Sequence, residues 1–381
     1  MPDLSRLTAC LLAATLWCSA WAPDAGARPP TGKKSGQIDL AICLDTSNSM
    51  DGLIGSAKQQ LWDIVNELAK AEPAPTLRVA LYSYGNDDYV AKRGWVRKEM
   101  DFSTDLDGLS ERLFGLKTRG GTEYVGRVSR DALADLEWSS GSDVLKLVFV
   151  CGNEPADQDP DVSLKKIAST AKSQDAILNT IYCGNAGDKE ATSWRHLASL
   201  AGGRFSVIDQ ERGQVSIPTP YDKPLAELGE KLNDTFLFHG RDSAKKTENQ
   251  LAQDANAAKL SSGAAAARAQ SKAGSIYRSA LDDLVERSDK DSNFDIASVP
   301  EADLPAKLKE LRPEARKARV HELSAERKKL QKEIGELGKK REAYLRAEAK
   351  KRNAKGSKAL GEAVGGMLRE QAKTKGIDIP E

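Results

Sequence analysis

Short apolar segments alternate with amphipathic stretches between residues 37 and 212. A short continuous apolar run predicts a buried strand, and apolar residues at helical spacing predict an amphipathic helix. Strands are predicted at residues 38–44, 77–84, 94–102, 144–151, 177–183 and 204–208, and helices at 53–68, 106–116, 124–136, 163–172 and 192–201. This alternation predicts an α/β fold with a doubly wound, mostly parallel six-stranded sheet, in which residues 94–102 form an edge strand.

The pattern changes after Pro218-Thr219-Pro220, where aromatic residues become sparse and Ala, Lys and Glu increase. Residues 221–285 have the pattern of paired helices, and residues 306–353 that of one long charged helix. In this helix Leu323, Leu330, Leu337 and Tyr344 recur every seven residues, which is typical of a partly coiled-coil-like seam. The seam fits either packing against the chain's own body or pairing with another molecule. We therefore expect an α-helical C-terminal region.

These patterns divide the chain into successive parts. We predict a signal peptide at residues 1–27, a linker at 28–36, an α/β domain at 37–215, a helical hairpin region at 221–285, a long charged helix at 306–353 and a C-terminal tail at 354–381.

Composition excludes several classes of protein. The 381 residues are 40% hydrophobic and 30% charged, which is too polar for an integral membrane bundle and too apolar for a wholly disordered chain. The net charge of +1 excludes a uniformly basic nucleic-acid binder. The net charge is unevenly distributed. Residues 1–300 carry 35 Lys and Arg and 42 Asp and Glu, a net charge of −7, whereas residues 301–381 carry 22 Lys and Arg and 14 Asp and Glu, a net charge of +8. The basic end fits either a solvated helix face or weak contact with an anionic surface.

The first residues have the pattern of an export signal. Arg6 precedes an uncharged stretch at residues 7–17, and small residues follow at Ala25-Gly26-Ala27, after which we predict cleavage. The apolar run is shorter than the roughly 20 residues of a membrane-spanning helix, which disfavours a permanent anchor. We therefore expect an exported protein, periplasmic or secreted.

Cleavage after Ala27 would leave three cysteines, Cys43, Cys151 and Cys183, each at the end of a predicted strand. They fit buried free thiols, and a Cys151–Cys183 bridge between neighbouring strands is the alternative.

A candidate metal motif follows the first predicted strand. Asp45-Thr46-Ser47-Asn48-Ser49 has the pattern Asp-x-Ser-x-Ser. Two hydroxyls two residues apart on a tight loop can face one ion, and hard oxygen ligands of this kind suit Mg²⁺, with Mn²⁺ or Ca²⁺ as alternatives. A simple turn and helix cap is the other interpretation of such a loop.

A second motif, Arg119-Gly120-Gly121-Thr122-Glu123, precedes a predicted helix, and its glycines would let the Thr122 hydroxyl approach the same ion. With both motifs in this order, residues 36–212 resemble the von Willebrand factor type A domain. The resemblance implies a metal-ion-dependent adhesion site at the top edge of the sheet. Its implied metal residues are Asp45, Ser47, Ser49 and Thr122, with Asp45 acting through water.

The chain departs from this family at the end of the fourth predicted strand. The family has Thr-Asp-Gly there, whereas this chain has Cys151-Gly152-Asn153, so that Gly152 takes the place of a carboxylate. Glu154 is close enough in sequence to substitute as a metal residue. The alternatives are that Glu154 is a solvated loop residue and that the fold is retained with a degenerate metal site.

The wider resemblance is to exported bacterial proteins that join such a domain to a charged helical C-terminal region. It is carried by Asn153-Glu154-Pro155, by Thr180-Ile181-Tyr182-Cys183-Gly184, by Ala252-Gln253-Asp254-Ala255-Asn256-Ala257-Ala258 and by Lys272-Ala273-Gly274.

The motifs favour a binding protein. We expect a non-enzymatic, divalent-metal-dependent module of the bacterial envelope that captures an acidic group of a partner protein. The alternative is a structural or assembly scaffold in which the helical region acts and the metal site is degenerate. The sequence has no nucleophile elbow and no phosphate-binding Gly-rich loop with Lys, which disfavours an enzyme. We expect no nucleic acid as partner, and the few heptads do not indicate an oligomeric state.

Overall fold

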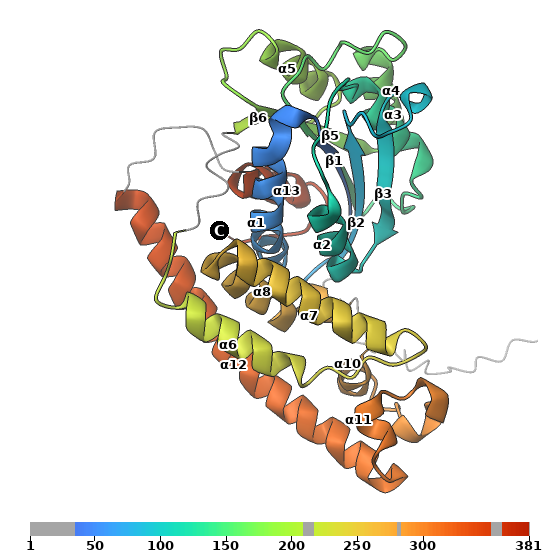
Figure 1. Ribbon diagram of the computed structural model, residues 1–381, viewed down its shortest axis with the longest axis vertical. Helices are drawn as coiled ribbons and strands as arrows, with labels where there is room; N and C mark the ends of the chain where they lie inside the picture. The colour runs from blue at the N-terminus through green and yellow to red at the C-terminus, as the bar shows by residue number, and fades with distance from the viewer. Residues whose placement is uncertain (1–34, 209–216, 280–282, 352–359, 381) are drawn as a thin grey trace, which may run out of the picture. The chain divides into compact units, whose positions relative to one another are not determined.

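A computed structural model describes residues 35–208, 217–279, 283–351 and 360–380 of the chain. The predicted signal peptide at 1–27, and all of the predicted linker except Ser35 and Gly36, lie outside the described residues. The centre of the structure is a six-stranded sheet (Figure 1). Its strands are β1 (Gln37–Asp45), β2 (Thr76–Tyr84), β3 (Val96–Ser103), β4 (Val144–Gly152), β5 (Ala176–Cys183) and β6 (Phe205–Ile208).

The strand order is β3-β2-β1-β4-β5-β6, with β3 antiparallel to β2 and every other neighbouring pair parallel. The predicted mostly parallel sheet with an antiparallel edge strand is therefore confirmed. The order reverses at β1, from which β2 lies on one side and β4 on the other. The carboxyl ends of β1 and β4 thus meet at a topological switch point, where open α/β sheets bind ligands.

Helices cover both faces of this sheet, because each parallel connection must cross a face. One core contains Leu40 and Leu44 of β1, together with the helices α1 (Asp51–Leu68) and α2 (Leu106–Gly115). The other core contains Ala41 and Cys43 of β1, together with α3 (Val125–Asp135), α4 (Leu164–Ser173) and α5 (Ala191–Leu200). Alternate residues of one strand thus enter two cores, which is why residues 40–44 are apolar at every position.

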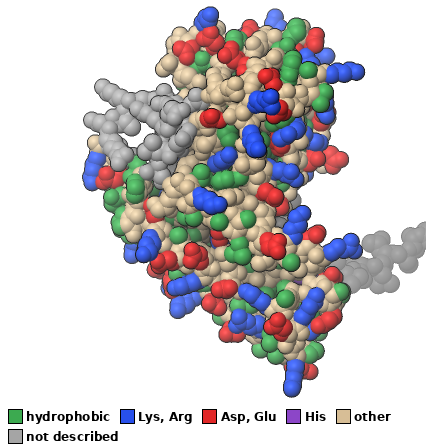
Figure 2. Space-filling model, in the orientation of Figure 1, with side chains coloured by type: hydrophobic (Ala, Val, Ile, Leu, Met, Phe, Trp, Pro, Cys, Tyr) green, Lys and Arg blue, Asp and Glu red, His purple; other side chains and the backbone are tan. Residues whose placement is uncertain are grey.

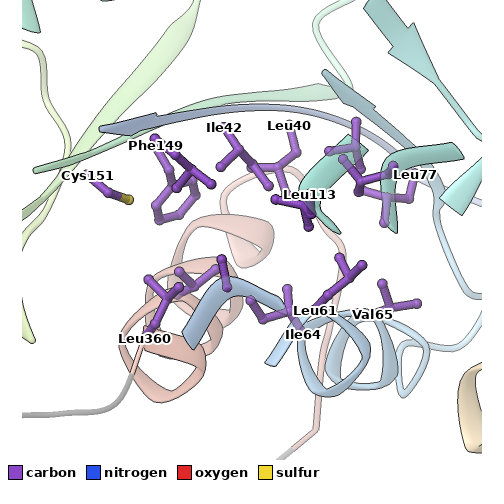
Figure 3. A pocket seen from close by; sticks show the side chains of 15 residues that line it. Leu40, Ile42, Leu61, Ile64, Val65, Leu77, Leu113, Phe149, Cys151 and Leu360 are labelled. Carbon is purple, nitrogen blue, oxygen red and sulfur yellow. The ribbon is translucent and has the colours of Figure 1, made fainter. Parts of the chain in front are cut away.

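The first of these cores includes a small cavity of about 50 Å³ between the sheet and the helices (Figure 3). Leu40 and Phe149 approach it from the sheet and Leu61 from α1, while Leu360 belongs to a helix near the chain's end. Since its walls are apolar and its volume is that of one or two methyl groups, we regard it as a packing defect of the core.

Residues 217–351 are helical wherever they form regular elements, apart from one isolated bridge between Phe238 and Asp283. The α-helices are α6 (Asp222–Asn233), α7 (Ser243–Leu260), α8 (Ser262–Ala273), α9 (Ser275–Ser279), α10 (Leu284–Lys290), α11 (Ala306–Lys309) and α12 (Pro313–Lys351).

The long helix α12 begins at Pro313, seven residues after the predicted start at residue 306. In its seam Leu323 and Leu330 are buried, Leu337 is half-buried and Tyr344 is exposed, and the helix contacts α6, α8 and α10 of the same chain. The seam therefore packs against the chain's own body, the first of the two interpretations that the sequence left open.

The C-terminal helix α13 (Leu360–Lys373) returns to the α/β domain and packs beside α1 (Figure 1). Gln371 and Asn179 of β5 exchange side-chain hydrogen bonds of 2.9 and 2.7 Å. Beyond the helix, Lys375 binds Asp175 at 2.7 Å and the carbonyl oxygen of Ser142 at 2.9 Å. Asp175 and Ser142 precede β5 and β4, so the chain's end lies along the edge of the sheet opposite the predicted metal motif.

A network of buried charges joins the α/β domain to the helical region. Arg268 of α8 contacts Asp107 of α2 at 2.5 Å and Asp254 of α7 at 2.8 Å. Lys272, one turn further along α8, contacts Asp254 at 2.5 Å, and Tyr277 donates a hydrogen bond of 2.5 Å to Asp107. Buried charges are tolerated only when they are paired in this way, so the network requires the two regions to fold together.

Lys272 leads to a prediction about pH. Burial lowers its pKa from 10.5 to about 8, against the opposing effect of Asp254. Between these two values the unfolded chain holds the proton that the folded chain has lost, so the free energy of unfolding should rise with pH in this window. In urea titrations from pH 8 to 10.5 we expect the wild type to gain stability relative to Lys272→Met. Parallel stability curves for the two proteins would contradict the assignment.

The three cysteines after the predicted signal are all buried, free thiols. Burial raises the pKa of Cys43 and of Cys151, so both stay protonated and unreactive at neutral pH. The bridge considered between Cys151 and Cys183 does not form in this structure.

Acidic and basic side chains are interspersed on the molecular face shown in Figure 2. On α12, Arg346 lies 2.7 Å from Glu342 and Lys351 lies 2.6 Å from Glu348, so basic side chains of this helix are partly neutralised by neighbouring acids. Among the described residues, no helix is long and apolar enough to cross a membrane.

Candidate functional site

The predicted metal motif lies at the carboxyl end of β1, beside the carboxyl end of β4. Asp45 is the last residue of β1, and the chain then enters a loop and the 3-10 helix η1 (Asn48–Met50) before α1 begins. Gly152 ends β4 and Tyr84 ends β2, so both residues lie at the same edge of the sheet. Three strand ends and their loops therefore form the candidate site.

Asp45 is fully buried, and one of its two carboxylate oxygens has no partner. Its Oδ1 accepts a hydrogen bond of 2.8 Å from the backbone N–H of Ser47, whereas its Oδ2 makes no hydrogen bond. Burial raises the pKa of Asp45 to about 8; the Ser47 N–H opposes this, and the nearby Glu123 and Glu154 reinforce it. An unpaired buried carboxylate is costly, and a cation would relieve that cost.

The two predicted serine ligands lie together. The Oγ atoms of Ser47 and Ser49 are 3.2 Å apart, with Ser47 buried and Ser49 exposed. The side-chain amide of Asn153, in the loop after β4, donates a hydrogen bond of 3.1 Å to Ser49 Oγ. Two hydroxyl oxygens beside a buried carboxylate form the oxygen-rich environment that hard divalent cations prefer.

The second predicted motif is joined to the first by backbone hydrogen bonds. The N–H of Asn48 donates to the carbonyl of Gly120 at 2.6 Å, and the N–H of Arg119 donates to the carbonyl of Thr46 at 2.9 Å. The N–H of Gly120 also donates to Asn48 Oδ1 at 3.1 Å. These bonds hold the loop before α3, which carries Thr122, against the Asp45 loop.

Thr122 is half-buried, and its hydroxyl makes no hydrogen bond to another side chain or carbonyl in the described part of the chain. The structure thus brings the loops of all four family residues together.

Gly152, where the family has a carboxylate, has no room for a side chain. A Cβ at this position would overlap the hydroxyl oxygen of Tyr84 and lie 3.0 Å from Asp45 Oδ2 and 3.1 Å from Trp194 Cη2. The Tyr84 hydroxyl is held there because it donates a hydrogen bond of 3.0 Å to the Cys151 carbonyl. Tyr84 therefore occupies the space of the missing side chain.

This packing predicts a specific coupling between two positions. We expect Gly152→Ala to lower the free energy of unfolding by about 1–3 kcal/mol, because the added methyl group overpacks the site. In a Tyr84→Phe background the cost should be smaller, since the clashing oxygen is gone. A double-mutant cycle by chemical denaturation measures this coupling, and additive effects of the two changes would contradict the steric explanation.

Glu154, the predicted replacement carboxylate, is exposed. Its carbonyl oxygen accepts a hydrogen bond of 2.6 Å from Trp194 Nε1, which fixes its backbone and not its carboxylate. Its negative charge nevertheless acts on both Asp45 and Glu123, so Glu154 lies at the rim of the site.

Glu123 is a buried residue of the site that the sequence analysis did not select. A methyl group built on Gly85 would lie 2.8 Å from Glu123 Cγ and 2.9 Å from Asp45 Oδ1, so both side chains border the same space. Burial raises the pKa of Glu123, while a hydrogen bond with the Ser47 side chain lowers it. The available signal was its position directly after Thr122, but neighbouring residues of an extended segment normally point in opposite directions.

Other charged and ionisable side chains near these loops are exposed. His196 is exposed on α5, and Asp88 forms an ion pair of 2.6 Å with Arg119 of the second motif. Within the described residues, no group of three or more His, Cys, Asp or Glu side chains is arranged to hold a metal ion. A metal at this edge would therefore depend on hydroxyl oxygens as well as carboxylates.

Comparison with known proteins identifies the α/β domain. Residues 39–215, just under half of the chain, match the family model of the von Willebrand factor type A domain. A search among curated proteins gives no match.

Several solved structures are similar. Proximal thread matrix protein 1 from the mussel byssus is 17% identical over 47% of this chain and 43% of its own, with a TM-score of 0.36. A second structure of that protein, with a zinc-occupied MIDAS motif, is 17% identical over 45% of this chain and 42% of its own, with a TM-score of 0.35. The pilus adhesin SpaC from Lactobacillus rhamnosus GG is 13% identical over 47% of this chain and 29% of its own, with a TM-score of 0.36.

The chain spans less than half the length of the mussel protein. The family match and the observed sheet agree on the fold of one part of the molecule. Residues 39–215 match the von Willebrand factor type A domain, the described residues among them form a sheet of this type, and a helical C-terminal region follows in this chain.

Proposed function

We propose that this chain is an exported, non-enzymatic binding protein of the bacterial envelope that captures an acidic group of a partner protein through a divalent cation. The observation that carries the proposal is Asp45, a buried carboxylate with an unpartnered oxygen beside two hydroxyls. The side chains present fit a hard cation, for which Mg²⁺ is the first candidate and Mn²⁺ and Ca²⁺ are alternatives. Asp45, Ser47, Ser49 and Thr122 would hold it, with Glu154 at the rim.

The metal would supply an electrophilic centre with an open position for an oxygen ligand. Ser47, Ser49 and Thr122 are neutral, so the cation's charge is compensated only by nearby carboxylates. A partial excess of positive charge at the surface favours an acidic group of the partner as the final ligand.

The described surroundings of the site favour binding over catalysis. The side chains around Asp45 are hydroxyls, carboxylates and the amide of Asn153, and His196 is exposed on α5. This arrangement offers oxygen ligands without a nucleophile held by a general base. The scaffold alternative is less favoured, because the seam of α12 packs against the same chain.

The proposal is tested by affinity capture from envelope extract on immobilised full-length protein without its predicted signal. We expect a partner that is retained in Mg²⁺, released by EDTA, retained again when Mg²⁺ is restored, and absent from a Ser47→Ala/Ser49→Ala column. A Ser139→Ala column is the matched control, because Ser139 lies outside the site. Partners held equally well in EDTA or by the double variant would reject metal-dependent capture.

A further inference from the structure

We propose that Glu123 is the second carboxylate of the metal site and supplies the negative charge that Gly152 cannot supply. This inference deepens the proposed function and rests on it. It also assigns the carboxylate to a different residue from Glu154, the one that sequence spacing favours.

The first step is that position 152 is closed to a carboxylate. The Tyr84 hydroxyl and Trp194 fill the space beside Gly152, and Asp45 Oδ2 faces the same point from 3.0 Å. A carboxylate that completes the site must therefore come from another strand end or loop.

The second step is that Glu123 reaches the site from the opposite loop. Its side chain is only 8% exposed, and its Cγ borders the same space beside Gly85 as Asp45 Oδ1. Its backbone is fixed, since its carbonyl oxygen accepts a hydrogen bond of 2.6 Å from Gln158 Nε2. The backbone N–H of Ser47 donates a hydrogen bond of 2.8 Å to Asp45 Oδ1, which fixes that oxygen at the space that it shares with Glu123 Cγ.

The third step is that no basic side chain accounts for this pair of buried acids. In the described part of the chain, neither Asp45 nor Glu123 forms an ion pair with a Lys or Arg side chain. Elsewhere in the described chain, buried acids such as Asp107 and Asp283 contact arginine. Together with the unpartnered Asp45 Oδ2, this indicates that the compensating charge is a bound cation.

The test compares two neighbouring carboxylates in the full-length protein without its predicted signal. Mn²⁺ and Mg²⁺ are titrated into wild type, Glu123→Gln and Glu154→Gln by calorimetry, and bound Mn²⁺ is counted by electron paramagnetic resonance. We expect Glu123→Gln to weaken Mn²⁺ binding about tenfold or more, as for groups that directly surround a metal, and Glu154→Gln to change it by less than about threefold.

A melting temperature in EDTA separates a metal role from a structural one. Removing one of two unpaired buried charges should leave the metal-free Glu123→Gln protein at least as stable as the wild type, while it loses the rise in melting temperature that Mn²⁺ produces. Glu123→Asp, which keeps the charge but shortens the side chain, should bind Mn²⁺ with intermediate affinity.

The outcomes are distinct. If the wild type binds Mn²⁺ and Glu123→Gln binds it equally well, the assignment of Glu123 is overturned and the metal site stands. If Glu154→Gln alone loses binding, the second carboxylate is Glu154. If the wild type binds neither metal, both the metal-dependent function and this inference are overturned.

Discussion

Replacement of Arg268 by methionine is expected to lower the free energy of unfolding by about 3–5 kcal/mol, the usual cost of breaking a buried ion pair. Arg268 is 1% exposed and contacts Asp107 and Asp254. Its guanidinium also lies 4.3 Å from the ring centre of Trp62 and 5.0 Å from that of Tyr277. Methionine would fill much of the volume but leave buried carboxylates without their counter-charge. Urea denaturation followed by circular dichroism measures the change.

Two variants make this prediction specific. Arg93→Met removes an exposed arginine that lies 3.8 Å from Asp135, and we expect it to change stability by less than about 0.5 kcal/mol. Arg268→Met combined with Asp107→Asn should recover part of the loss, because the second change removes an uncompensated buried charge. If Arg268→Met costs less than about 1 kcal/mol, the network does not hold the two regions together.

Replacement of Asp45 by asparagine is expected to weaken Mg²⁺ and Mn²⁺ binding about 100-fold, the upper end of the loss seen around metal sites. The change keeps the shape of the side chain but removes the negative charge that lies deepest in the site. We expect the metal-free variant to be no less stable than the wild type, because the buried carboxylate has an unpartnered oxygen. Calorimetric titration of the full-length protein without its predicted signal measures the affinity.

Asp51→Asn is the matched control, at the first residue of α1 directly after the Asp45 loop. Asp51 is exposed and accepts a hydrogen bond from Thr118, so we expect its replacement to leave metal affinity nearly unchanged. Equal loss in both variants would point to a general effect of surface charge. Unchanged binding in Asp45→Asn would show that the metal lies elsewhere.

The sheet and its helices could be predicted because their signals are local. The strand Gln37–Asp45 has an uninterrupted apolar run at residues 40–44, and α4 has apolar residues at helical spacing. Six strands and the five helices of the α/β domain were accordingly predicted close to their observed ends. The Asp-x-Ser-x-Ser motif was equally visible, since its hydroxyls are two residues apart on one loop.

The surroundings of the motif depended on residues far apart in the chain. Tyr84 comes from β2 and fills the space at Gly152 on β4, and Glu123 reaches Asp45 from the loop before α3. No local sequence pattern predicts these contacts, because contacts between distant residues depend on the strand order and on the path of each loop.

The α/β class, the edge strand, the helical character of the C-terminal region and the loop with the candidate ligands follow from local patterns in the sequence. The packing of the α12 seam within the chain and the return of α13 beside α1 follow only from contacts between distant segments. The same kind of contact joins Arg268 to the α/β domain and buries Glu123 beside Asp45, while Glu154 stays exposed. Hydrophobic periodicity specifies which face of an element is buried, whereas long-range packing specifies what buries it.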